Sequence, residues 1–379
     1  MDFELSDDQR MAVEEARRFA VEKLGPGAAE RDEKAEVDVK LLKQLGELGY
    51  LGMTLPEAYG GTALGAVAYA GSMIEIAKMD AGVAVAMSVQ NSLVNDAIEH
   101  FGTEAQKAEY LPKLAAGEWI GCFSLTEAGA GSDPASMRTT AVKDGDGYVL
   151  NGTKNFTTNG AIADAVIVFT RVDIGGKPGI SAFLVKKGTP GFSVGKHENK
   201  MGIRSSSTTE MVFTKCRVPK EALLGEEGKG LKIALTTLDG GRIGIAAQAV
   251  GIAEAALEES VRYAKERTQF GKPIGELEGI QFMLADMATD VELAKTMLFR
   301  VAWMKDSGKK RYTKEAAMLK LFASEMAHRV CHKAIQVHGG YGFMKEFKVE
   351  RLYRDQRITE IYEGTSEIQR YVIARNLLG

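Results

Sequence analysis

The spacing of apolar residues changes twice along this chain of 379 residues, and the two changes limit its possible folds more than any other feature. Up to about residue 118 the apolar residues recur with a helical period. The chain then turns to short β-branched and aromatic segments, and from about Leu231 to the end long helical periods return. We therefore predict a multi-domain α+β protein with an all-helical N-terminal domain (1–118), a central β domain (119–230) and a C-terminal four-helix bundle (231–379).

Local signals place individual elements inside these domains. Ser6-Asp7-Asp8-Gln9 has the form of a capping box, which predicts that the first helix begins there. Further N-terminal helices are expected over 40–48, 66–78, 81–100 and 104–115. Strand-like segments at 147–150, 165–170, 180–185 and 211–213 predict a β-barrel or an orthogonal sandwich. Apolar stripes at 243–263, 280–304 and 316–337 predict the long helices of the bundle.

Composition and charge exclude several classes of protein. The formal net charge is -3 and no Lys/Arg-rich block is present, so nucleic-acid binding is not expected. The cysteines, Cys122, Cys216 and Cys331, have no paired spacing, which favours free thiols in a reducing compartment. No apolar run reaches the roughly twenty residues that a membrane span needs, and the N-terminus shows no targeting pattern. These features predict a cytoplasmic protein, and the bacterial cytoplasm is the compartment we expect.

One pair of histidines has the spacing of metal ligands. His328 and His332 lie four residues apart, on one face of a predicted helix, and Cys331 is beside them. However, no Glu stands where a zinc-binding HExxH motif places it, and no further cluster of ligands accompanies the pair. We therefore expect no metal.

The candidate catalytic residue is a carboxylate in the segment 353–370, between two helical stretches. Glu363 lies between Tyr362 and Gly364, and the small neighbour leaves its carboxylate oxygens and the adjacent backbone N–H groups open to a substrate. This environment suits a general base. The alternative is a solvated loop glutamate, because most charged side chains are exposed.

Two segments of the β domain carry groups that suit a phosphate or a flavin. In Gly129-Ala130-Gly131-Ser132 the backbone amides could approach a phosphate, but the six-residue dinucleotide fingerprint is absent, which excludes a Rossmann fold and leaves a tight turn as the alternative. In the segment 154–160, Phe156 is two residues from the hydroxyl of Thr158, a pairing that suits one face and the reactive nitrogen of an isoalloxazine. A strand end with one core Phe is the alternative there.

Two C-terminal segments suit a pyrophosphate. Arg267 opens the segment Arg267-Thr268-Gln269-Phe270-Gly271 and could pair bidentately with a pyrophosphate. The glycine pair in the segment 336–342 permits close backbone approach to the same group. A helix-capping or surface role is the alternative for Arg267.

Taken together, seven segments resemble the acyl-CoA dehydrogenase family of flavoenzymes in order and spacing. They span essentially the whole chain and read PEAYGG, FSLTEAGAGSD, NGTKNFTTNG, LDGGRIGIAAQA, RTQFGKPI, QVHGGYGF and IYEGTSEIQR. The resemblance implies the three-domain order given above, with FAD held between the β domain and the bundle. It also implies a homotetramer, a dimer of dimers, in which a neighbouring subunit grips part of the FAD.

The resemblance implies a specific task for Glu363. In this family the corresponding residue removes the α-proton of an acyl thioester while hydride leaves the β-carbon for flavin N5. The thioester oxygen is held in the family by the N–H of the base and by a flavin ribityl hydroxyl, which stabilises charge where it develops. An apolar acyl chain that closes the site excludes water and should raise the pKa of Glu363 toward neutrality.

The resemblance also implies binding roles, motif by motif. Residues expected to contact FAD at or near the flavin are Phe123, Leu125, Thr126, Gly131, Ser132, Phe156 and Thr158. Residues expected at the ADP end of FAD are Arg267, Gln269 and Phe270 from one subunit and Gln336, Gly339 and Gly340 from its partner, with Thr365 and Glu367 within reach. Residues expected to hold the acyl-CoA are Ser132, Asp239, Arg242, Tyr362 and Gly364.

Two positions depart from the pattern of many family members. Phe156 stands where many have Trp, which keeps a flat apolar cover but removes an indole N–H, with consequences for flavin potential or acceptor access. Some branched-chain and long-chain members carry the base on the helix of the LDGGR segment, where this chain has Gly241. No rival carboxylate is present there, so the base is assigned to Glu363.

The implied activity is FAD-dependent α,β-dehydrogenation of a short- or medium-chain acyl-CoA to the trans-2-enoyl-CoA, with electrons passed to electron-transfer flavoprotein. The stretch GRIGIAAQA is most similar to short-chain, butyryl-type members. Side chains around Met87–Asn95 are expected to set the depth of the acyl pocket. An acyl-CoA oxidase of the same fold and a non-catalytic flavoprotein or helical scaffold are the alternatives.

Overall fold

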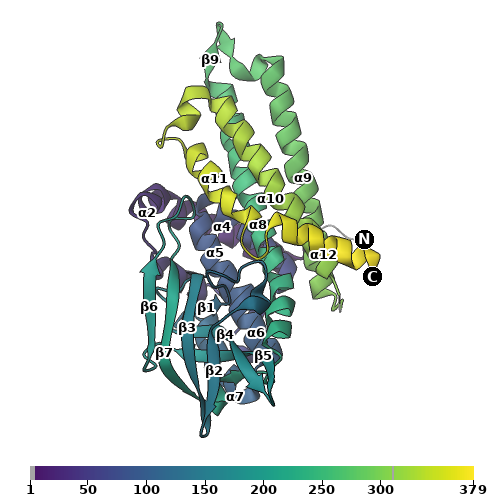
Figure 1. The fold of residues 1–379 in the computed structure, drawn as a ribbon. Helices are drawn as coiled ribbons and strands as arrows, with labels where there is room; N and C mark the ends of the chain where they lie inside the picture. The colour runs from purple at the N-terminus through teal and green to yellow at the C-terminus, as the bar shows by residue number, and fades with distance from the viewer. Residues whose placement is uncertain (1–4, 310) are drawn as a thin grey trace.

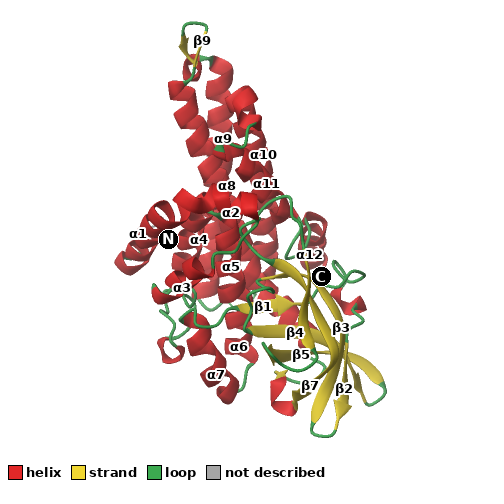
Figure 2. Cartoon of the chain, turned by 90° about the vertical axis from the view of Figure 1, so that its left-hand side faces the viewer, coloured by secondary structure: helices red, strands yellow, loops and turns green. Residues whose placement is uncertain are grey.

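The computed structural model describes residues 5–309 and 311–379 and is elongated (Figure 1). Long C-terminal helices form one end of the molecule, and the β strands form the other end. The N-terminal helices pack beside both parts (Figure 2). None of the described helices is both long and apolar enough to cross a membrane.

The N-terminal part is helical, as predicted. Its helices are α1 (Asp7–Phe19), α2 (Ala28–Lys34), α3 (Val39–Glu47), α4 (Gly65–Met79), α5 (Ala81–Ser88), α6 (Asp96–Phe101) and α7 (Glu104–Ala115). The capping box is confirmed, because the Ser6 hydroxyl accepts from the Gln9 N–H at 3.3 Å and the Gln9 side chain accepts from the Ser6 N–H at 3.1 Å.

The helix predicted over 81–100 is not continuous, and this part of the prediction is wrong. A π-helical turn at Val89–Asn95 separates α5 from α6. Asn91 holds the turn in place: its Nδ2 donates to Tyr50 O at 2.8 Å and its Oδ1 accepts from the Met53 N–H at 2.9 Å. Every residue of the turn is buried, so the hydrophobic period gives no sign of the extra residue per turn.

The central part forms one sheet of eight strands. These are β1 (Gly121–Ser124), β2 (Thr140–Asp144), β3 (Gly147–Thr158), β4 (Ala165–Ile174), β5 (Lys177–Lys186), β6 (Phe192–His197), β7 (Thr208–Pro219) and β8 (Leu223–Leu224). Their order is β6-β7-β3-β2-β4-β5-β8, and β1 runs parallel to β4. A single pair, Thr140 with Arg171, joins the two antiparallel halves. The halves share a core in which Val168 of one half and Phe213 of the other are buried, as in a barrel or sandwich.

Strand β4 is buried on both faces. Val166 and Val168 face the core of the sheet, whereas Ile167 and Phe169 belong to a second core with Leu111 of α7. Figure 2 shows α6 and α7 beside the strands. This contact fixes the sheet, and with it β1, against the N-terminal helices.

The C-terminal part forms the helical bundle. Its elements are α8 (Gly230–Glu266), a small hairpin of β9 (Thr268–Gln269) and β10 (Lys272–Pro273), α9 (Glu278–Asp306), α10 (Thr313–His338), α11 (Lys348–Gln356) and α12 (Ser366–Leu378). Helix α8 packs against both α10 and α4, so the N-terminal and C-terminal helices share one hydrophobic core. Gly251 permits the approach of α8 to α4, because a Cβ there would lie 2.5 Å from Ile74 O.

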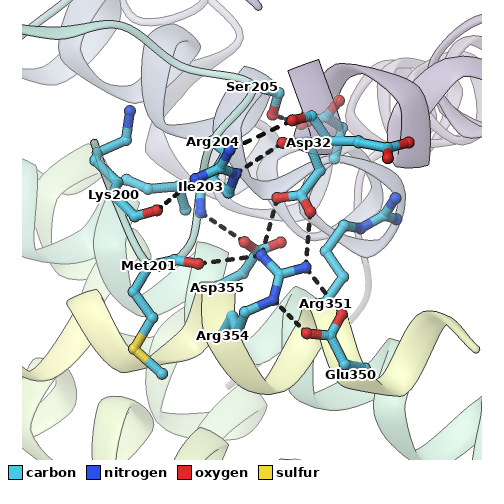
Figure 3. A network of polar contacts seen from close by, with 12 residues as sticks. Asp32, Lys200, Met201, Ile203, Arg204, Ser205, Glu350, Arg351, Arg354 and Asp355 are labelled. Carbon is cyan, nitrogen blue, oxygen red and sulfur yellow. Dashed lines mark hydrogen bonds and ion pairs between the residues drawn. The ribbon is translucent and has the colours of Figure 1, made fainter. Parts of the chain in front are cut away.

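A polar network joins three separate segments of the chain (Figure 3). One of these segments, α11, precedes the candidate catalytic residue in the sequence. Arg354 on α11 donates to the two carboxylate oxygens of Asp32 on α2, at 3.1 and 2.7 Å, and to Met201 O at 3.1 Å. These bonds connect α2, the loop 198–207 and α11. Because α11 leads into the turn that carries Glu363, the network helps to fix the position of that turn.

Candidate active site

A cavity of about 190 Å³ lies where the β domain, the π-helical turn, α8 and the turn before α12 meet. Its walls bring together most of the residues expected at the flavin and at the thioester: Phe123, Leu125, Thr126, Gly131, Ser132, Phe156, Thr158, Arg242, Tyr362, Glu363 and Gly364. These residues come from separate stretches of the chain, so only folding assembles the site.

Glu363 has a left-handed backbone conformation on the wall of this cavity. Its φ is 53° and that of Gly364 is 92°, and such a φ costs a non-glycine residue free energy and is common at functional sites. The turn follows a 3₁₀ segment (Arg357–Glu360) and ends where the Thr365 side chain accepts from the Ile368 N–H at 3.3 Å to cap α12. The backbone therefore presents Glu363 at a defined point between two helical segments.

The carboxylate of Glu363 has an uncommitted oxygen. Its Oε2 atom is buried and has no hydrogen-bond partner among the described residues. Burial raises the pKa of Glu363 to about 7, although the nearby cations Lys320 and Arg242 act to lower it. A carboxylate with this pKa and a free oxygen is suited to accept a proton near neutral pH.

Gly241 on α8 makes room for that carboxylate. A Cβ at this position would lie 2.1 Å from Glu363 Oε2 and 2.9 Å from Leu93 Cδ2. From the sequence alone, Gly241 shows only that no second carboxylate competes with Glu363 for the role of base. In the structure, it is also the position where any side chain would push the Glu363 carboxylate aside.

Arg242 brings a buried cation to the same cavity. Its Nη1 donates to Asp239 Oδ1 at 2.7 Å, and the other oxygen of Asp239 accepts from the Thr313 hydroxyl at 2.5 Å. The Nε atom of Arg242 has no partner among the described residues. Asp239 therefore holds Arg242 without lining the cavity itself, and one N–H of Arg242 is left for a ligand.

A β-bulge turns Phe156 toward the cavity. The pairing of β3 with β7 shifts register between Lys154 and Thr157, and Phe156 has a φ of 56° and is 61% exposed. Thr158 lines the same cavity. The predicted pairing of a flat apolar ring with a hydroxyl is thus present at the site.

A buried ion pair anchors the loop that carries Gly131 and Ser132. Lys154 Nζ donates to Glu127 Oε1 at 2.8 Å and to Leu125 O at 3.0 Å. Burial acts to raise the pKa of Glu127, but hydrogen bonds from Lys154 and from backbone N–H groups outweigh it and lower this pKa to about 2. Apart from its neighbours in the chain, a Cβ built at Gly131 would meet no atom of the described residues within 4 Å, so a ligand can approach the backbone there.

A second hollow, of about 630 Å³, lies at the tip of the bundle near β9, at the end away from the β domain (Figure 1). Its lining includes five expected residues, Arg267, Gln269, Phe270, Gly339 and Gly340. The guanidinium of Arg267 lies 5.5 Å from the ring centroid of Tyr341, and Phe270 is 90% exposed. Apart from the neighbouring residues of the chain, no atom of the described residues lies within 4 Å of a Cβ built at Gly339 or Gly340. The hollow offers a cation and open backbone, the groups that a pyrophosphate needs.

Four expected site residues do not line either hollow, namely Asp239, Gln336, Thr365 and Glu367. Gln336 is exposed on α10, Thr365 caps α12, and Glu367 is exposed in the first turn of α12. The expected division of the ADP-end residues between two subunits stays a prediction. One chain brings both Arg267 and Gly339 to the same hollow, because the loop after α8 and the end of α10 meet at the bundle tip.

Further residues complete the first cavity. Val89 and Leu93 lie in the segment expected to set its depth, while Val85, Pro134, Asn155, Leu235, Leu238 and Ile368 were not expected there. The spacing of Leu235, Leu238 and Arg242 on one face of α8 is a signal that could have identified two of them. Lys320 was also not predicted as a site residue. Its position as a lysine within the apolar helical run 316–323 is the signal that could have identified it.

The first histidine of the pair with metal-ligand spacing, His328, lies beside a glutamine side chain. His328 Nδ1 lies 3.1 Å from Gln356 Nε2, and Cys331 is buried. Within residues 5–309 and 311–379, no group of three or more His, Cys, Asp and Glu residues is placed to hold a metal ion.

Comparison with known proteins finds matches along the whole chain. Residues 6–118, 122–216 and 228–378 match the N-terminal, middle and C-terminal domains of acyl-CoA dehydrogenases, in that order. The mitochondrial short-chain specific acyl-CoA dehydrogenase of Bos taurus is 50% identical over 376 residues, which are 99% of this chain and 91% of that protein.

Two solved structures have nearly the same fold. The butyryl-CoA dehydrogenase of Megasphaera elsdenii superposes with a TM-score of 0.98 and 47% identity over 100% of both chains. A structure described as the electron transferring flavoprotein of Acidaminococcus fermentans contains a chain with a TM-score of 0.97 and 47% identity, again over 100% of both chains.

Proposed function

The chain belongs to the acyl-CoA dehydrogenase family, of the short-chain type, and we propose that it converts a short-chain acyl-CoA to the trans-2-enoyl-CoA with Glu363 as the base. The observation that carries this proposal is the free, buried oxygen of Glu363 beside Gly241. The cavity around it is lined mainly by apolar side chains, which suits an acyl chain.

Glu363 removes the α-proton of the thioester. Its Oε2 atom loses no protein hydrogen bond when it does so, and its pKa of about 7 matches a base that works near neutral pH. In the described residues the Glu363 N–H donates to no acceptor. This N–H is therefore available to the thioester oxygen, where negative charge develops as the proton leaves.

The residues present fit FAD. The exposed ring of Phe156 with Thr158 suits the flavin, and the open backbone at Gly131 suits close approach. Bound FAD supplies the acceptor for the hydride that leaves the β-carbon. Phe123, Leu125, Thr126, Ser132, Phe156 and Thr158 would hold its flavin end, and Arg267, Gln269, Phe270, Gly339 and Gly340 its ADP end.

Two copies of the chain are needed to hold one FAD. Arg242 at the first cavity and Arg267 at the second hollow are separated by about 37 Å along α8, at 1.5 Å per residue. This separation exceeds the length of one FAD molecule, so the flavin and ADP ends contact different subunits. The homotetramer expected from the sequence satisfies this need, and the exposed apolar residues Phe282, Leu293 and Trp303 on α9 suit burial in an assembly.

Electron-transfer flavoprotein is the electron acceptor that we propose. Support comes from the near-identical fold of the chain in the structure described as an electron transferring flavoprotein. Reoxidation of the reduced enzyme should be fast with electron-transfer flavoprotein and slow in air. Fast reoxidation by oxygen alone would identify an acyl-CoA oxidase instead.

An anaerobic titration with acyl-CoAs of increasing chain length tests the proposed function. We expect the visible flavin band to bleach, with the largest effect for butyryl-CoA and weaker effects for long chains, because the chain is similar to short-chain and butyryl-CoA dehydrogenases along its whole length. A protein that stays colourless after gentle purification and FAD reconstitution, or that bleaches with no acyl-CoA, would refute the proposal.

Removal of the cation at the bundle tip should weaken FAD retention. We expect Arg267→Ala to raise the dissociation constant of FAD about tenfold, since a hydrogen bond to a charged group contributes roughly 1.5–3 kcal/mol. The apparent affinity for butyryl-CoA should change little, and FAD fluorescence after dilution measures the first quantity. Arg262→Ala is the matched control, because Arg262 is an exposed arginine near the end of α8 that pairs with Glu259 outside the hollow. Equal losses of FAD and substrate affinity would count against the assignment.

A further inference from the structure

Lys320 on α10 differs from the other buried lysines. The buried lysines of the described residues are Lys78, Lys154 and Lys320. Lys78 and Lys154 each have a carboxylate partner within hydrogen-bond distance. The side chain of Lys320 is 0% exposed, and its Nζ donates to the backbone carbonyl of Gly364 at 2.7 Å, with no carboxylate within ion-pair distance in the described part of the chain.

A buried cation without an ion-pair partner costs free energy. Lys320 lies in the apolar run 316–323, where a methionine would pack in the same space. Packing therefore does not explain the lysine. Its contact with the turn that carries Glu363 offers an explanation.

The side chains of Lys320 and Gln369 fix the backbone carbonyls of Glu363 and Gly364. Lys320 precedes this turn in the sequence, and Gln369 follows it. Gly364 O accepts from Lys320 Nζ at 2.7 Å and from Gln369 Nε2 at 2.8 Å, and Glu363 O accepts from Gln369 Nε2 at 3.1 Å. A trans peptide group is planar, so a fixed carbonyl also fixes the N–H of the next residue. The two side chains thereby hold the peptide groups on both sides of Gly364, whose φ is 92°.

Lys320 and Glu363 are each the charged group with the largest effect on the other. Burial lowers the pKa of Lys320 to about 7. Among the charged groups, Glu363, Glu360 and Glu367 act to raise this pKa, whereas Arg242 on α8 acts to lower it. Glu367 is exposed, Glu360 pairs with Arg357, and Arg242 is already paired with Asp239 within α8. Lys320 and Arg242 are in turn the charged groups that act on Glu363.

We propose that Lys320 is a positioning residue for the dehydrogenation: its hydrogen bond to Gly364 O holds the turn of Glu363, and its charge favours the ionised form of the Glu363 carboxylate. This inference rests on the proposed role of Glu363 as the base.

Two variants separate the hydrogen bond from the charge. Lys320→Met removes both at nearly constant volume, whereas Gln369→Leu removes hydrogen bonds to the same turn and no charge. Loss of a cation raises the pKa of a nearby carboxylate, so a higher pH is needed to ionise Glu363. We therefore expect Lys320→Met to move the acidic limb of the kcat/KM profile to higher pH by roughly one unit. Both variants should lower kcat, but Gln369→Leu should leave the limb in place.

A second readout does not depend on turnover. A 3-oxoacyl-CoA has an acidic α-proton and no β-hydride, and the absorbance of its enolate reports proton transfer to the enzyme. Its pH dependence should shift in Lys320→Met in the same direction as the kinetic limb. Lys333→Met is the control, because Lys333 is on the same helix and pairs with Asp286 at the surface, and wild-type behaviour is expected from it.

The outcomes are distinct. An unchanged acidic limb in a folded, FAD-loaded Lys320→Met protein overturns the proposal, and so does an equal shift in Gln369→Leu, which would assign the effect to loop geometry alone. If Lys320→Met does not fold, Lys320→Gln is measured in its place and the same limb decides. Failure of the proposed function shows separately, as full activity in Glu363→Gln.

Discussion

Replacement of Glu363 by Gln should lower kcat for butyryl-CoA by roughly 10³- to 10⁴-fold, which is the upper part of the range for loss of a general base. Glutamine has nearly the same shape and fills the same space beside Gly241, but it cannot accept the α-proton. Steady-state assays with an artificial electron acceptor measure the loss. FAD content and the unfolding temperature should stay near their wild-type values, because Oε2 makes no hydrogen bond to the described residues that the substitution would break.

The pH dependence of kcat/KM in the wild type tests the same role of Glu363. Glu363 must be ionised to act, and its pKa is about 7, so kcat/KM should fall as the pH drops below about 7. Glu325→Gln is the control, because Glu325 is a carboxylate on α10 that pairs with Arg370 outside the cavity. Full activity in Glu363→Gln would remove Glu363 from the mechanism.

Gly241→Ala is expected to lower the activity without lowering the stability. The added Cβ would lie 2.1 Å from Glu363 Oε2, and that oxygen is at the end of a flexible side chain, so the base moves instead of the backbone. A displaced base should lower kcat by roughly 10²-fold, the effect expected of a misplacement of about 1 Å. The unfolding temperature should not fall, because Ala favours a helix over Gly by about 1 kcal/mol.

The preceding residue supplies the matched control. A Cβ at Gly240 would lie 3.0 Å from Asp96 Oδ2 and 3.1 Å from Lys305 Nζ, both ends of side chains away from the candidate site. Gly240→Ala has the same helix-propensity gain and should retain most of the activity. Similar kcat values in the two variants would show that the space beside Glu363 has no special role.

Local signals in the sequence predict much of the fold for identifiable reasons. The capping box at Ser6 and the two changes of hydrophobic period depend on neighbouring residues alone, and the structure has the helix start and the order of helical and β parts that they imply. The π-helical turn at Val89–Asn95 could not be predicted, because its residues are buried on every side. The single pairing of β2 with β4 depends on contacts between distant segments. The domain boundaries, the tetramer and the cytoplasmic location stay predictions.

The site was predictable where one residue and its neighbour define the chemistry. Glu363 beside a glycine, and Phe156 near Thr158, are examples, and the structure brings both to one cavity. The role of Gly241 depends on a contact across the fold and cannot be read from its neighbours in sequence. Lys320 is similar, because only the fold places α10 against the turn before α12.

The central claim is that Glu363 is the base of a short-chain acyl-CoA dehydrogenase. Anaerobic rapid mixing of butyryl-CoA with FAD-loaded wild type and with Glu363→Gln tests this claim most directly. We predict that the wild type bleaches its flavin band, while the variant binds butyryl-CoA with similar affinity and keeps its flavin absorbance. Bleaching of the variant at the wild-type rate would contradict the claim.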